Sequence, residues 1–235
     1  MSDQKKTEKK QTIFITGASS GIGKATALRL GKEGWNVALA ARSVDELEKI
    51  AAELPKGQSL VLDCDVTNSA QVEKCFEIAN DTFGRIDAVY ANAGTGGKPG
   101  GFSEAPQESW QQIVDINIMG LAKTIQAAMP YIKKSEGHFV VTGSVAGRRY
   151  LDGSMYSVSK HAANALAYDL RGELQGSGCR VTLIEPGMVD TPFFDDGKPD
   201  ALRPDDVARA VAYAVAQPKS VEIGDILILP VKKAD

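Results

Sequence analysis

The sequence predicts a single α/β domain, with a doubly wound parallel sheet covered by helices on both faces. Three observations predict this fold class: short strand-like runs alternate with longer helical patterns, those runs are apolar on successive residues, and a glycine-rich turn follows the first of them. Strands that are apolar on both faces are typical of parallel sheets buried between two helix layers. A chain of 235 residues is long enough to form such a domain with its own core.

The first half of the chain is predicted to contain four strands and three helices in alternation. Each strand is a short apolar run, and each helix is a longer stretch with helical periodicity between two such runs. The predicted strands are residues 12–16, 36–41, 60–62 and 86–91. The predicted helices are residues 21–32, 43–53 and 69–83.

The second half continues the alternation and includes one long helix. Residues 107–133 are predicted to form it, with Pro130 weakening its end because proline lacks the backbone N–H that an inner turn needs. The sequence has no internal repeat and no linker, so residues 11–235 are predicted to be one domain after a disordered polar tail over residues 1–10. The remaining predicted helices are 154–176 and 205–216, and the remaining strands are 138–142, 180–185 and 226–229.

Composition and charge limit the classes of partner. The formal net charge of −3 favours neither nucleic acid nor a membrane surface as a partner, and no apolar run reaches the ~18 residues of a membrane-spanning helix. Cys64, Cys75 and Cys179 have no metal-ligand spacing, so we expect no metal site and interpret them as apolar residues in a reducing compartment. The polar N-terminus lacks the apolar stretch of a signal peptide, and we expect a cytoplasmic protein.

A glycine-rich turn joins the first predicted strand to the first helix, and it reads Thr16-Gly17-Ala18-Ser19-Ser20-Gly21-Ile22-Gly23. Glycines at such a turn let the backbone approach a pyrophosphate closely. The helix N-terminus then supplies free N–H groups and the positive end of its dipole. Because the glycines follow strand one and open helix one, the turn predicts a dinucleotide cofactor.

The same turn also satisfies the Gly-x-Ser-x-Gly elbow of serine hydrolases. That elbow normally lies well inside its chain, whereas here it begins at Gly17. The histidines, His138 and His161, have no clear acid–base context. The hydrolase interpretation is therefore the weaker one.

The end of the second strand distinguishes NADP from NAD. A site selective for NAD carries an acidic residue about twenty residues beyond the glycines, where it binds the ribose 2′-hydroxyl. Here the segment reads Ala40-Ala41-Arg42-Ser43, with no acid before Asp45. The guanidinium of Arg42 suits a 2′-phosphate, which favours NADP over NAD. The alternative is that Arg42 is an exposed residue at the start of a helix.

Tyr156 and Lys160 lie four residues apart in a predicted helix, so the phenol and the ammonium share one face. Tyrosine titrates near pH ~10, and a fixed positive charge beside it lowers that pKa toward the range useful for acid–base catalysis. The same spacing also occurs in solvated pairs on amphipathic helices. The pair is an acid–base candidate whose weight depends on the rest of the chain.

With these features in register, the chain resembles the short-chain dehydrogenase/reductase superfamily over nearly its full length, and the resemblance implies a Rossmann fold. The motifs follow the family's order along the chain. They are the turn 16–23, Asp65-Val66, Ala91-Asn92-Ala93-Gly94, Asn117, Ser144, Tyr156 with Lys160, and Pro186-Gly187 with Thr191.

The resemblance implies a role for each matched residue. Tyr156 donates a proton to the substrate oxygen or accepts it in reverse, and Lys160 lowers the pKa of Tyr156 and binds the nicotinamide ribose. Ser144 holds the substrate oxygen beside Tyr156, and Asn117 positions a water that links Lys160 to solvent. The implied cofactor contacts are Gly17, Ser19, Ser20, Gly21, Ile22, Gly23, Arg42, Asp65, Val66, Asn92, Ala93, Gly94, Tyr156, Lys160, Pro186, Gly187, Val189 and Thr191.

Several matched residues also have a purely structural interpretation. Asn117 suits a bridge within the long helix, Ser144 suits a turn, and Asn92 suits a tie between strands. Asp65 suits the cap of the helix that follows it, and Thr191 is also compatible with an ordinary loop. The sequence leaves both interpretations open for these residues.

Departures from the family pattern are small. Ala91 stands where many members carry a second asparagine, and the segment between Ser144 and Tyr156 is slightly shorter than in many relatives. We expect an accessible pocket with an apolar wall, flanked by the glycine-rich loop 95–101. The short segment 188–203, where the family places its substrate lid, contains Phe193, Phe194, Asp195 and Asp196.

The sequence thus predicts an NADP-dependent oxidoreductase that interconverts a small-molecule carbonyl and a secondary alcohol. One alternative is a reductase of 3-oxoacyl chains on an acidic carrier protein, which Arg148 and Arg149 would contact. Another is a non-catalytic NADPH-binding sensor or scaffold, against which the intact catalytic set argues. By analogy with relatives we expect a homodimer or homotetramer formed through helices 107–133 and 154–176.

Overall fold

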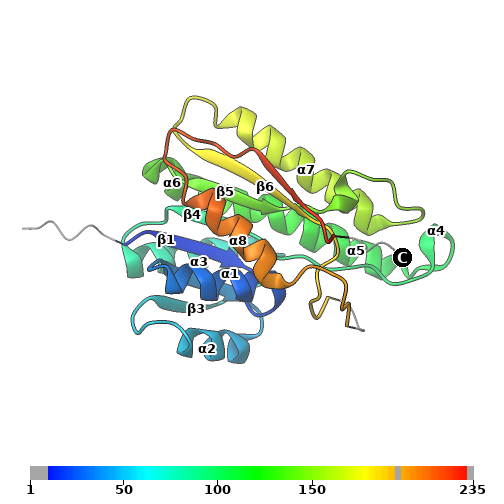
Figure 1. The fold of residues 1–235 in the computed structure, drawn as a ribbon, viewed down its shortest axis with the longest axis horizontal. Coiled ribbons are helices and arrows are strands. Elements are labelled where there is room, and N and C mark those ends of the chain that lie inside the picture. Colours follow the sequence, from blue (N-terminus) through cyan, green and yellow to red (C-terminus); the bar gives the residue numbers. More distant parts are fainter. Residues whose placement is uncertain (1–9, 194–196, 232–235) are drawn as a thin grey trace, which may run out of the picture.

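Seven strands of the described chain form one parallel sheet in the order β3-β2-β1-β4-β5-β6-β7, which confirms the predicted fold class. The computed structural model describes residues 10–193 and 197–231. The predicted tail over residues 1–9, and Phe194, Asp195 and Asp196 of the predicted lid, lie outside the described residues. Figure 1 shows the sheet running between two layers of helices.

The first half of the chain alternates between strands and helices as predicted. Elements β1, α1, β2 and α3 have the predicted bounds, and the other three differ by no more than two residues at an end. The strands are β1 (Thr12–Thr16), β2 (Asn36–Ala41), β3 (Ser59–Asp63) and β4 (Ala88–Ala91). The helices are α1 (Gly21–Lys32), α2 (Val44–Ala52) and α3 (Ser69–Phe83).

The long helix of the second half differs from the prediction. It is a helical run in three parts: α5 (Gln107–Ile113), a π-helical segment η1 (Val114–Gly120) and α6 (Leu121–Ser135). Pro130 lies inside α6 without ending it. A π segment widens the turn locally and often marks a functional position, and here it carries Asn117.

The remaining elements follow the predicted order, with two short additions. These additions are α4 (Gly101–Glu104), in the glycine-rich loop, and the 3₁₀ turn η2 (Val145–Gly147), directly after Ser144. The others are β5 (His138–Thr142), α7 (Met155–Glu173), β6 (Arg180–Pro186), α8 (Pro204–Val215) and β7 (Asp225–Ile228).

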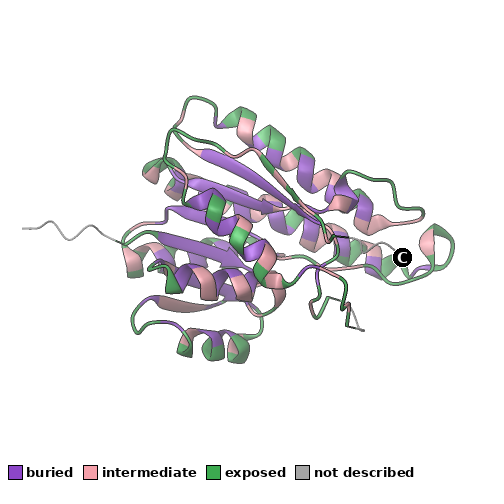
Figure 2. Ribbon diagram, viewed as in Figure 1, coloured by how far each residue is buried: buried purple, intermediate pink, exposed green. Residues whose placement is uncertain are grey.

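Two apolar cores lie on opposite faces of the sheet. One core joins the sheet to α1, α2 and α8 through side chains such as Leu30 and Val211. The other core joins it to α3, α6 and α7 through side chains such as Phe76. Neighbouring residues of β1 enter opposite cores, Ile13 the first and Phe14 the second. Figure 2 shows the buried strands between helices whose outer faces are exposed, which explains why the strands are apolar on both faces.

The strand order reverses between β1 and β4. From β1 the chain builds outward through β2 and β3, and it then returns to pair β4 with the other side of β1. Sheets of this kind bind their ligands outside the carboxyl ends of the strands at the point of reversal. The residues that follow β1 and β4, 17–20 and 92–95, therefore start at the expected ligand position.

The described ranges contain no helix with both the length and the apolar character that crossing a membrane requires. Within the same ranges, no group of three or more histidine, cysteine, aspartate or glutamate side chains is arranged to hold a metal ion.

Candidate active site

The turn between β1 and α1 follows a path that requires glycine. Gly17 and Gly21 have φ angles of 65° and 51°, in the left-handed region that side chains disfavour. A Cβ at Gly23 would lie 2.2 Å from the carbonyl oxygen of Gly17, so the turn folds tightly onto the start of α1. The N-cap residue, Ser20, makes no side-chain bond to the helix. The first N–H groups of α1 therefore remain available to an anion.

Hydrogen bonds from Asn92 hold this turn against the end of β4. Its backbone N–H donates to Thr16 Oγ1 at 3.0 Å, and its side-chain amide donates to the carbonyl oxygens of Thr16 and Gly17 at 3.2 and 3.3 Å. Its amide oxygen accepts from the Thr142 hydroxyl at 3.2 Å. These contacts fit the interpretation of Asn92 as a tie between strands, and Ala93 adds a bond from its N–H to Thr16 Oγ1 at 3.1 Å.

Arg42 follows β2 on the exposed surface and makes no ion pair within the described part of the chain. Asp65 follows β3, and its carboxylate accepts from the Thr67 N–H at 2.9 Å and from the Thr67 hydroxyl at 2.8 Å. The backbone bond from Thr67 is the main reason that the pKa of Asp65 is lowered. The cap of α3 is Asn68, not Asp65, because the Asn68 side chain accepts from the Gln71 N–H.

Three of the four predicted catalytic side chains, Asn117, Ser144 and Lys160, are buried near the carboxyl ends of β4 and β5. Lys160 Nζ donates to the carbonyl oxygen of Thr142, the last residue of β5, at 2.9 Å. The same nitrogen lies 5.8 Å from the centre of the Tyr156 ring. The i, i+4 spacing on α7 therefore brings the ammonium and the phenol together, as the sequence predicts.

Asn117 links three segments and does not bridge within its own helix. Its amide oxygen accepts from the Thr95 N–H at 2.8 Å, and its amide nitrogen donates to the Thr95 carbonyl at 2.9 Å. The same nitrogen donates to Ser159 Oγ at 3.0 Å, which reaches α7. These bonds hold the loop after β4 against the helix that carries Tyr156 and Lys160.

A small cavity adjoins this cluster. Its volume of about 10 Å³ approaches the space that one water molecule needs, and several polar side chains line it. The polar lining includes Asn117, Lys160, Thr142, Thr16 and Thr124. Its size and its lining are compatible with a water between Asn117 and Lys160, the role that the family resemblance implies for Asn117.

The electrostatics at Tyr156 differ from the balance that the sequence predicts. Burial raises the pKa of Tyr156 above its usual value, and a hydrogen bond with Ser144 acts in the opposite direction. Burial also lowers the pKa of Lys160 to about 8. Desolvation disfavours the charged form of both groups, and the hydrogen bond with Ser144 offsets part of the resulting rise in the pKa of Tyr156.

The segment after β6 lies across from the glycine turn. A Cβ at Gly21 would lie 3.1 Å from the Thr191 methyl carbon, so these two segments are in close contact. The ring of Phe193 lies 5.5 Å from that of Tyr156, and a Cβ at Gly96 would lie 2.9 Å from it. Phe193 therefore forms an apolar wall beside the Tyr156 phenol, as we expected of this segment.

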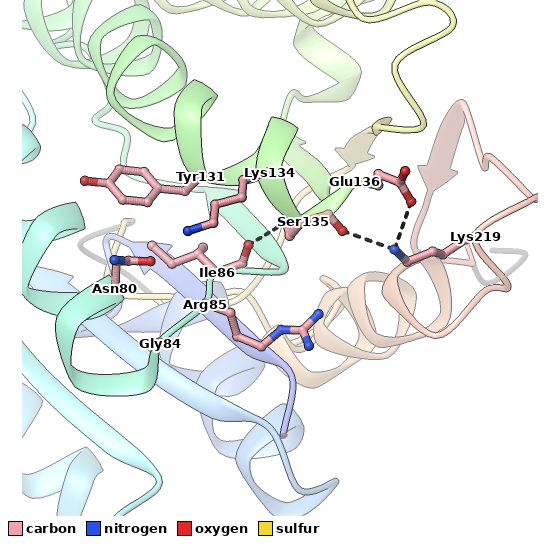
Figure 3. Close-up of a pocket in the computed structure, with 9 residues that line it drawn as sticks. All are labelled: Asn80, Gly84, Arg85, Ile86, Tyr131, Lys134, Ser135, Glu136 and Lys219. Carbon is pink, nitrogen blue, oxygen red and sulfur yellow. Dashed lines mark hydrogen bonds and ion pairs between the residues drawn. The ribbon is translucent and has the colours of Figure 1, made fainter. Parts of the chain in front are cut away.

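A larger cavity, of about 290 Å³, lies at the opposite end of the sheet (Figure 3). It contains none of the predicted site residues, and two of its cations are engaged. Arg85 binds Asp87 at 2.9 Å, and Lys219 binds Glu136 at 3.3 Å. The lining residues are Asn80, Gly84, Arg85, Ile86, Tyr131, Lys134, Ser135, Glu136 and Lys219.

Two residues behind the cluster of Asn117, Ser144 and Lys160 were not predicted from the sequence, and they are Glu185 and Asn164. Glu185 is fully buried at the end of β6, and Asn164 is buried on α7, four residues beyond Lys160. A charged residue inside the apolar run that ends at Pro186 was a visible signal for Glu185. Nothing comparable marks Asn164, which is one of several polar residues on a long helix.

A scan against protein families matches residues 11–201 to the short chain dehydrogenase family. Among the curated relatives, an uncharacterized oxidoreductase of Staphylococcus aureus is 37% identical over 222 residues, covering 92% of this chain and 96% of the relative. A second uncharacterized oxidoreductase, from Listeria monocytogenes, is 36% identical over 244 residues and covers 95% of this chain and 98% of the relative.

Solved structures of other proteins are also similar to this chain over more than nine tenths of its length. An alcohol dehydrogenase from Thermococcus sibiricus, complexed with 5-hydroxy-NADP, is 33% identical, has a TM-score of 0.87, and covers 96% of this chain and 98% of that one. A 3-ketoacyl-(acyl-carrier-protein) reductase from Brucella melitensis, complexed with NADH, is 27% identical, has a TM-score of 0.84, and covers 92% and 96%. The two complexes hold different nicotinamide cofactors.

Proposed function

The chain belongs to the short-chain dehydrogenase family, and from that premise we propose that it is an NADP(H)-dependent oxidoreductase that interconverts a carbonyl and a secondary alcohol. In this proposal Tyr156 is the general acid and base. The observation that carries it is the placement of Tyr156, Lys160 and Ser144 close to one another at the carboxyl end of β5.

The residues around the glycine turn fit a dinucleotide. The close approach of Gly23 to the carbonyl of Gly17 leaves no room for a side chain, and the first N–H groups of α1 have no side-chain cap. A pyrophosphate suits such a turn because backbone N–H groups and the helix dipole favour negative charge. Thr191 and Gly187 would line the nicotinamide side of the same site.

Arg42 supports NADP as the preferred form. Its guanidinium is exposed after β2 and is not engaged in an ion pair within the described residues. An arginine at this position pairs well with the oxygens of a 2′-phosphate, and the absence of an acid before Asp45 leaves the 2′-hydroxyl of NAD without its usual partner. Among the similar solved structures, both NADP and NADH complexes occur.

The bound nicotinamide would supply or accept hydride, and the protein's own side chains would manage the proton. Negative charge develops on a carbonyl oxygen as hydride adds, and the hydroxyls of Tyr156 and Ser144 would stabilise it by hydrogen bonds. With a pKa of about 8, Lys160 is mainly protonated at neutral pH and can return a proton toward Tyr156. Asn117 would hold the path from Lys160 toward solvent.

The alternative of a reductase that acts on 3-oxoacyl chains of an acidic carrier protein is less well supported by the structure than by the sequence. Arg148 binds the buried carboxylate of Glu185, so it is not free to contact an acidic carrier, and Arg149 alone remains for that role. The sensor alternative still competes, because a sensor of this fold would also bind NADPH.

The test is to follow the absorbance of NADPH and of NADH with a panel of ketones, aldehydes and secondary alcohols. Tyr156→Phe removes the proton donor and is expected to lower turnover by about a thousandfold, within the range of general acid–base catalysis. Tyr131→Phe, at the far cavity, is the matched control and should keep wild-type turnover. Wild-type turnover in Tyr156→Phe would refute the catalytic assignment, and NADPH binding without any turnover would favour the sensor.

A further inference from the structure

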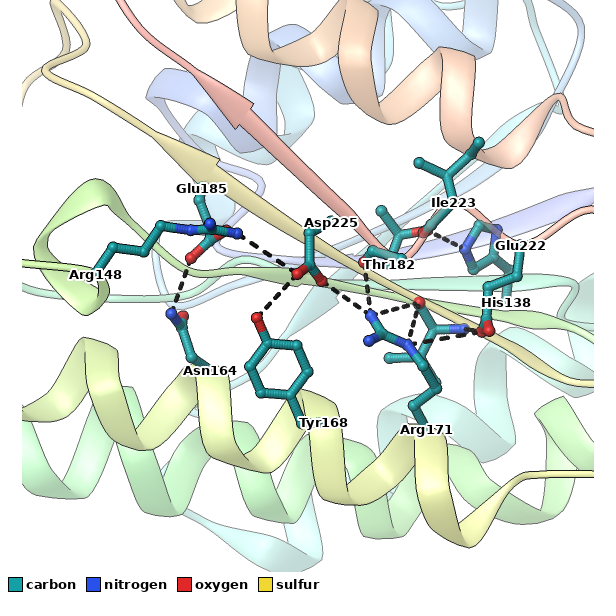
Figure 4. A network of polar contacts seen from close by, with 12 residues as sticks. His138, Arg148, Asn164, Tyr168, Arg171, Thr182, Glu185, Glu222, Ile223 and Asp225 are labelled. Atoms are coloured by element: carbon teal, nitrogen blue, oxygen red, sulfur yellow. Dashed lines mark hydrogen bonds and ion pairs between the residues drawn. The ribbon is translucent and has the colours of Figure 1, made fainter.

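Glu185 is the most deeply buried carboxylate near the catalytic cluster, with 0% of its surface exposed. It is the next-to-last residue of β6, just before Pro186. A buried carboxylate is costly unless donors surround it, so its partners show what it holds in place. Figure 4 shows that these partners come from two other segments of the chain.

Three donors surround the Glu185 carboxylate. Arg148 Nε donates to Oε2 at 2.6 Å, and Arg148 Nη2 makes a close ion pair with the same oxygen. Asn164 Nδ2 donates to Oε1 at 2.8 Å. Both oxygens are therefore engaged, and the carboxylate connects the segment of Arg148 directly to α7.

The two partners belong to the segments that carry the catalytic hydroxyls. Arg148 ends the short turn that begins at Ser144, and Asn164 lies on α7 two helical turns beyond Tyr156. Asn164 Nδ2 also donates to the carbonyl oxygen of Gly147, inside that turn, at 3.2 Å. One carboxylate and one amide thus hold the Ser144 turn and the Tyr156 helix to β6.

Two glycines show how closely the turn is pressed onto these groups. A Cβ at Gly143 would lie 2.7 Å from Asn164 Oδ1 and 3.1 Å from Glu185 Cγ. A Cβ at Gly147 would lie 2.7 Å from the carbonyl oxygen of Lys160. No side chain fits between the turn and its support, so the turn that begins at Ser144 packs directly on Glu185 and on α7.

An outer layer anchors Arg148 to the edge of the sheet. Arg148 Nη2 lies 3.5 Å from Asp225 Oδ2 on β7. The same carboxylate accepts from the Tyr168 hydroxyl at 2.9 Å and from Arg171 Nη2 at 3.1 Å. The last strand is therefore fastened to α7 through the residues that orient Arg148.

Resting on the proposed function, we propose that Glu185 is a positioning residue that acts through Ser144. Its buried carboxylate, held by Arg148 and Asn164, fixes the Ser144 turn against α7 and keeps the Ser144 hydroxyl within hydrogen-bonding reach of Tyr156. Among the described residues, the groups that face Tyr156 include Ser144, Lys160 and the uncharged ring of Phe193. Among them, Ser144 is the one whose position Glu185 controls.

The direction in which Glu185→Gln moves the pKa of Tyr156 separates a positioning role of Glu185 from a direct effect of its charge. Glu185→Gln removes a negative charge, and by charge alone this favours the phenolate and lowers the pKa of Tyr156. Loss of the Ser144 hydrogen bond has the opposite effect and raises that pKa. The two effects therefore move the midpoint in opposite directions.

The experiment is a fluorine NMR titration of the whole protein carrying fluorotyrosine, without cofactor or substrate. The chain has six tyrosines, and the spectrum of Tyr156→Phe identifies the signal of Tyr156. Glu185→Gln is expected to move the Tyr156 midpoint upward by about half a pH unit, the size of one weakened hydrogen bond. In the Ser144→Ala background the same substitution should give no upward shift, because the hydroxyl that it displaces is gone.

Asp87→Asn is the matched control. Asp87 is also a buried carboxylate held by an arginine, Arg85, but at the opposite end of the sheet. Its loss destabilises the fold in a similar way and should leave the Tyr156 midpoint unchanged. If Glu185→Gln does not fold, Arg148→Lys replaces it in the experiment. The Arg148 side chain is 40% exposed, and lysine keeps its positive charge but lacks the pair of guanidinium N–H groups that bind Glu185 Oε2.

An unchanged or lowered midpoint in Glu185→Gln, or an equal upward shift in Asp87→Asn, would overturn the proposal. The titration needs no turnover, so it judges Glu185 even if the substrate panel finds no activity and the proposed function fails. With an active substrate, Glu185→Gln should lower kcat by about tenfold and leave the KM for NADPH within about twofold, because the glycine turn is not in this network.

Discussion

The two ends of the sheet each contain a buried carboxylate gripped by an arginine, yet they have different consequences. At the amino end, Arg85 binds Asp87, which also accepts from the Thr12 N–H at 2.9 Å. At the carboxyl end, Arg148 binds Glu185. The first pair secures the start of β1, and the second supports the turn that begins at Ser144.

The titratable groups differ in the same way. At the amino end, burial lowers the pKa of His138 to about 3, and its ring bonds Thr182 at 2.7 Å. At the carboxyl end, burial lowers the pKa of Lys160 only to about 8. His138 therefore stays neutral near neutral pH, whereas Lys160 changes its protonation state near pH ~8. Both groups are buried, so the two ends differ in where the pKa falls relative to neutral pH and in what the group faces.

The largest expected difference between the two ends is in how a glycine substitution changes NADPH affinity. Gly23→Ala forces a Cβ toward the carbonyl of Gly17 and should weaken NADPH binding by about 3 kcal/mol, roughly a hundredfold, because the turn must shift. Gly137→Ala is equally crowded at the amino end, where a Cβ would lie 2.5 Å from the Asp87 carbonyl oxygen. It should lower the free energy of unfolding and leave NADPH affinity intact. Calorimetric titration and denaturant unfolding check both variants, and equal losses of affinity would break the comparison.

A smaller effect is expected from the exposed cations. Arg42→Ala should weaken NADPH binding by about 2 kcal/mol, roughly thirtyfold, because a charge-assisted bond to the 2′-phosphate is lost, and should change NADH binding little. Lys134→Ala removes a positive charge from the cavity at the amino end and should change the affinity for neither NADPH nor NADH. Fluorescence titration with both cofactors measures the difference. Equal losses for NADPH and NADH in Arg42→Ala would remove the argument for NADP.

The smallest effect is a pH dependence of stability at the amino end. The pKa of His138 is about 3 in the folded chain and near 6.5 when unfolded, so the unfolded chain binds more protons as the pH falls through this window. The free energy of unfolding should fall by about 1 kcal/mol from this residue between about pH 7 and about pH 5.5. His138→Gln should remove that part of the slope in denaturant titrations, while His161→Asn should keep it. A slope that survives in His138→Gln would show that another group causes it.

Much of this division between the two ends is visible in the sequence. The strands are apolar on successive residues because both faces are covered, and the glycine turn after β1 follows from the pattern of Gly17, Gly21 and Gly23. The i, i+4 spacing of Tyr156 and Lys160 is local, so the helix alone brings the pair together. Local patterns of this kind predicted most of the elements and the proximity of Tyr156 and Lys160.

What the sequence did not reveal depends on contacts between distant residues. Arg148 and Glu185 are separated by 37 positions, and their pairing follows from the packing of the Ser144 turn on β6. The π segment around Asn117 keeps the apolar spacing of a helix on both sides, so periodicity does not mark it. The raised pKa of Tyr156 depends on burial, which the i, i+4 spacing does not report.

The most direct test of which end of the sheet binds the cofactor is hydrogen–deuterium exchange with and without NADPH. It needs no substrate and reads both ends in one experiment. On NADPH binding we expect slower exchange at residues 17–24 and 92–95, at the carboxyl end, and unchanged exchange at residues 84–87 and 134–138, at the amino end. Protection confined to the amino end, or protection at neither end under conditions that saturate binding, would contradict this expectation.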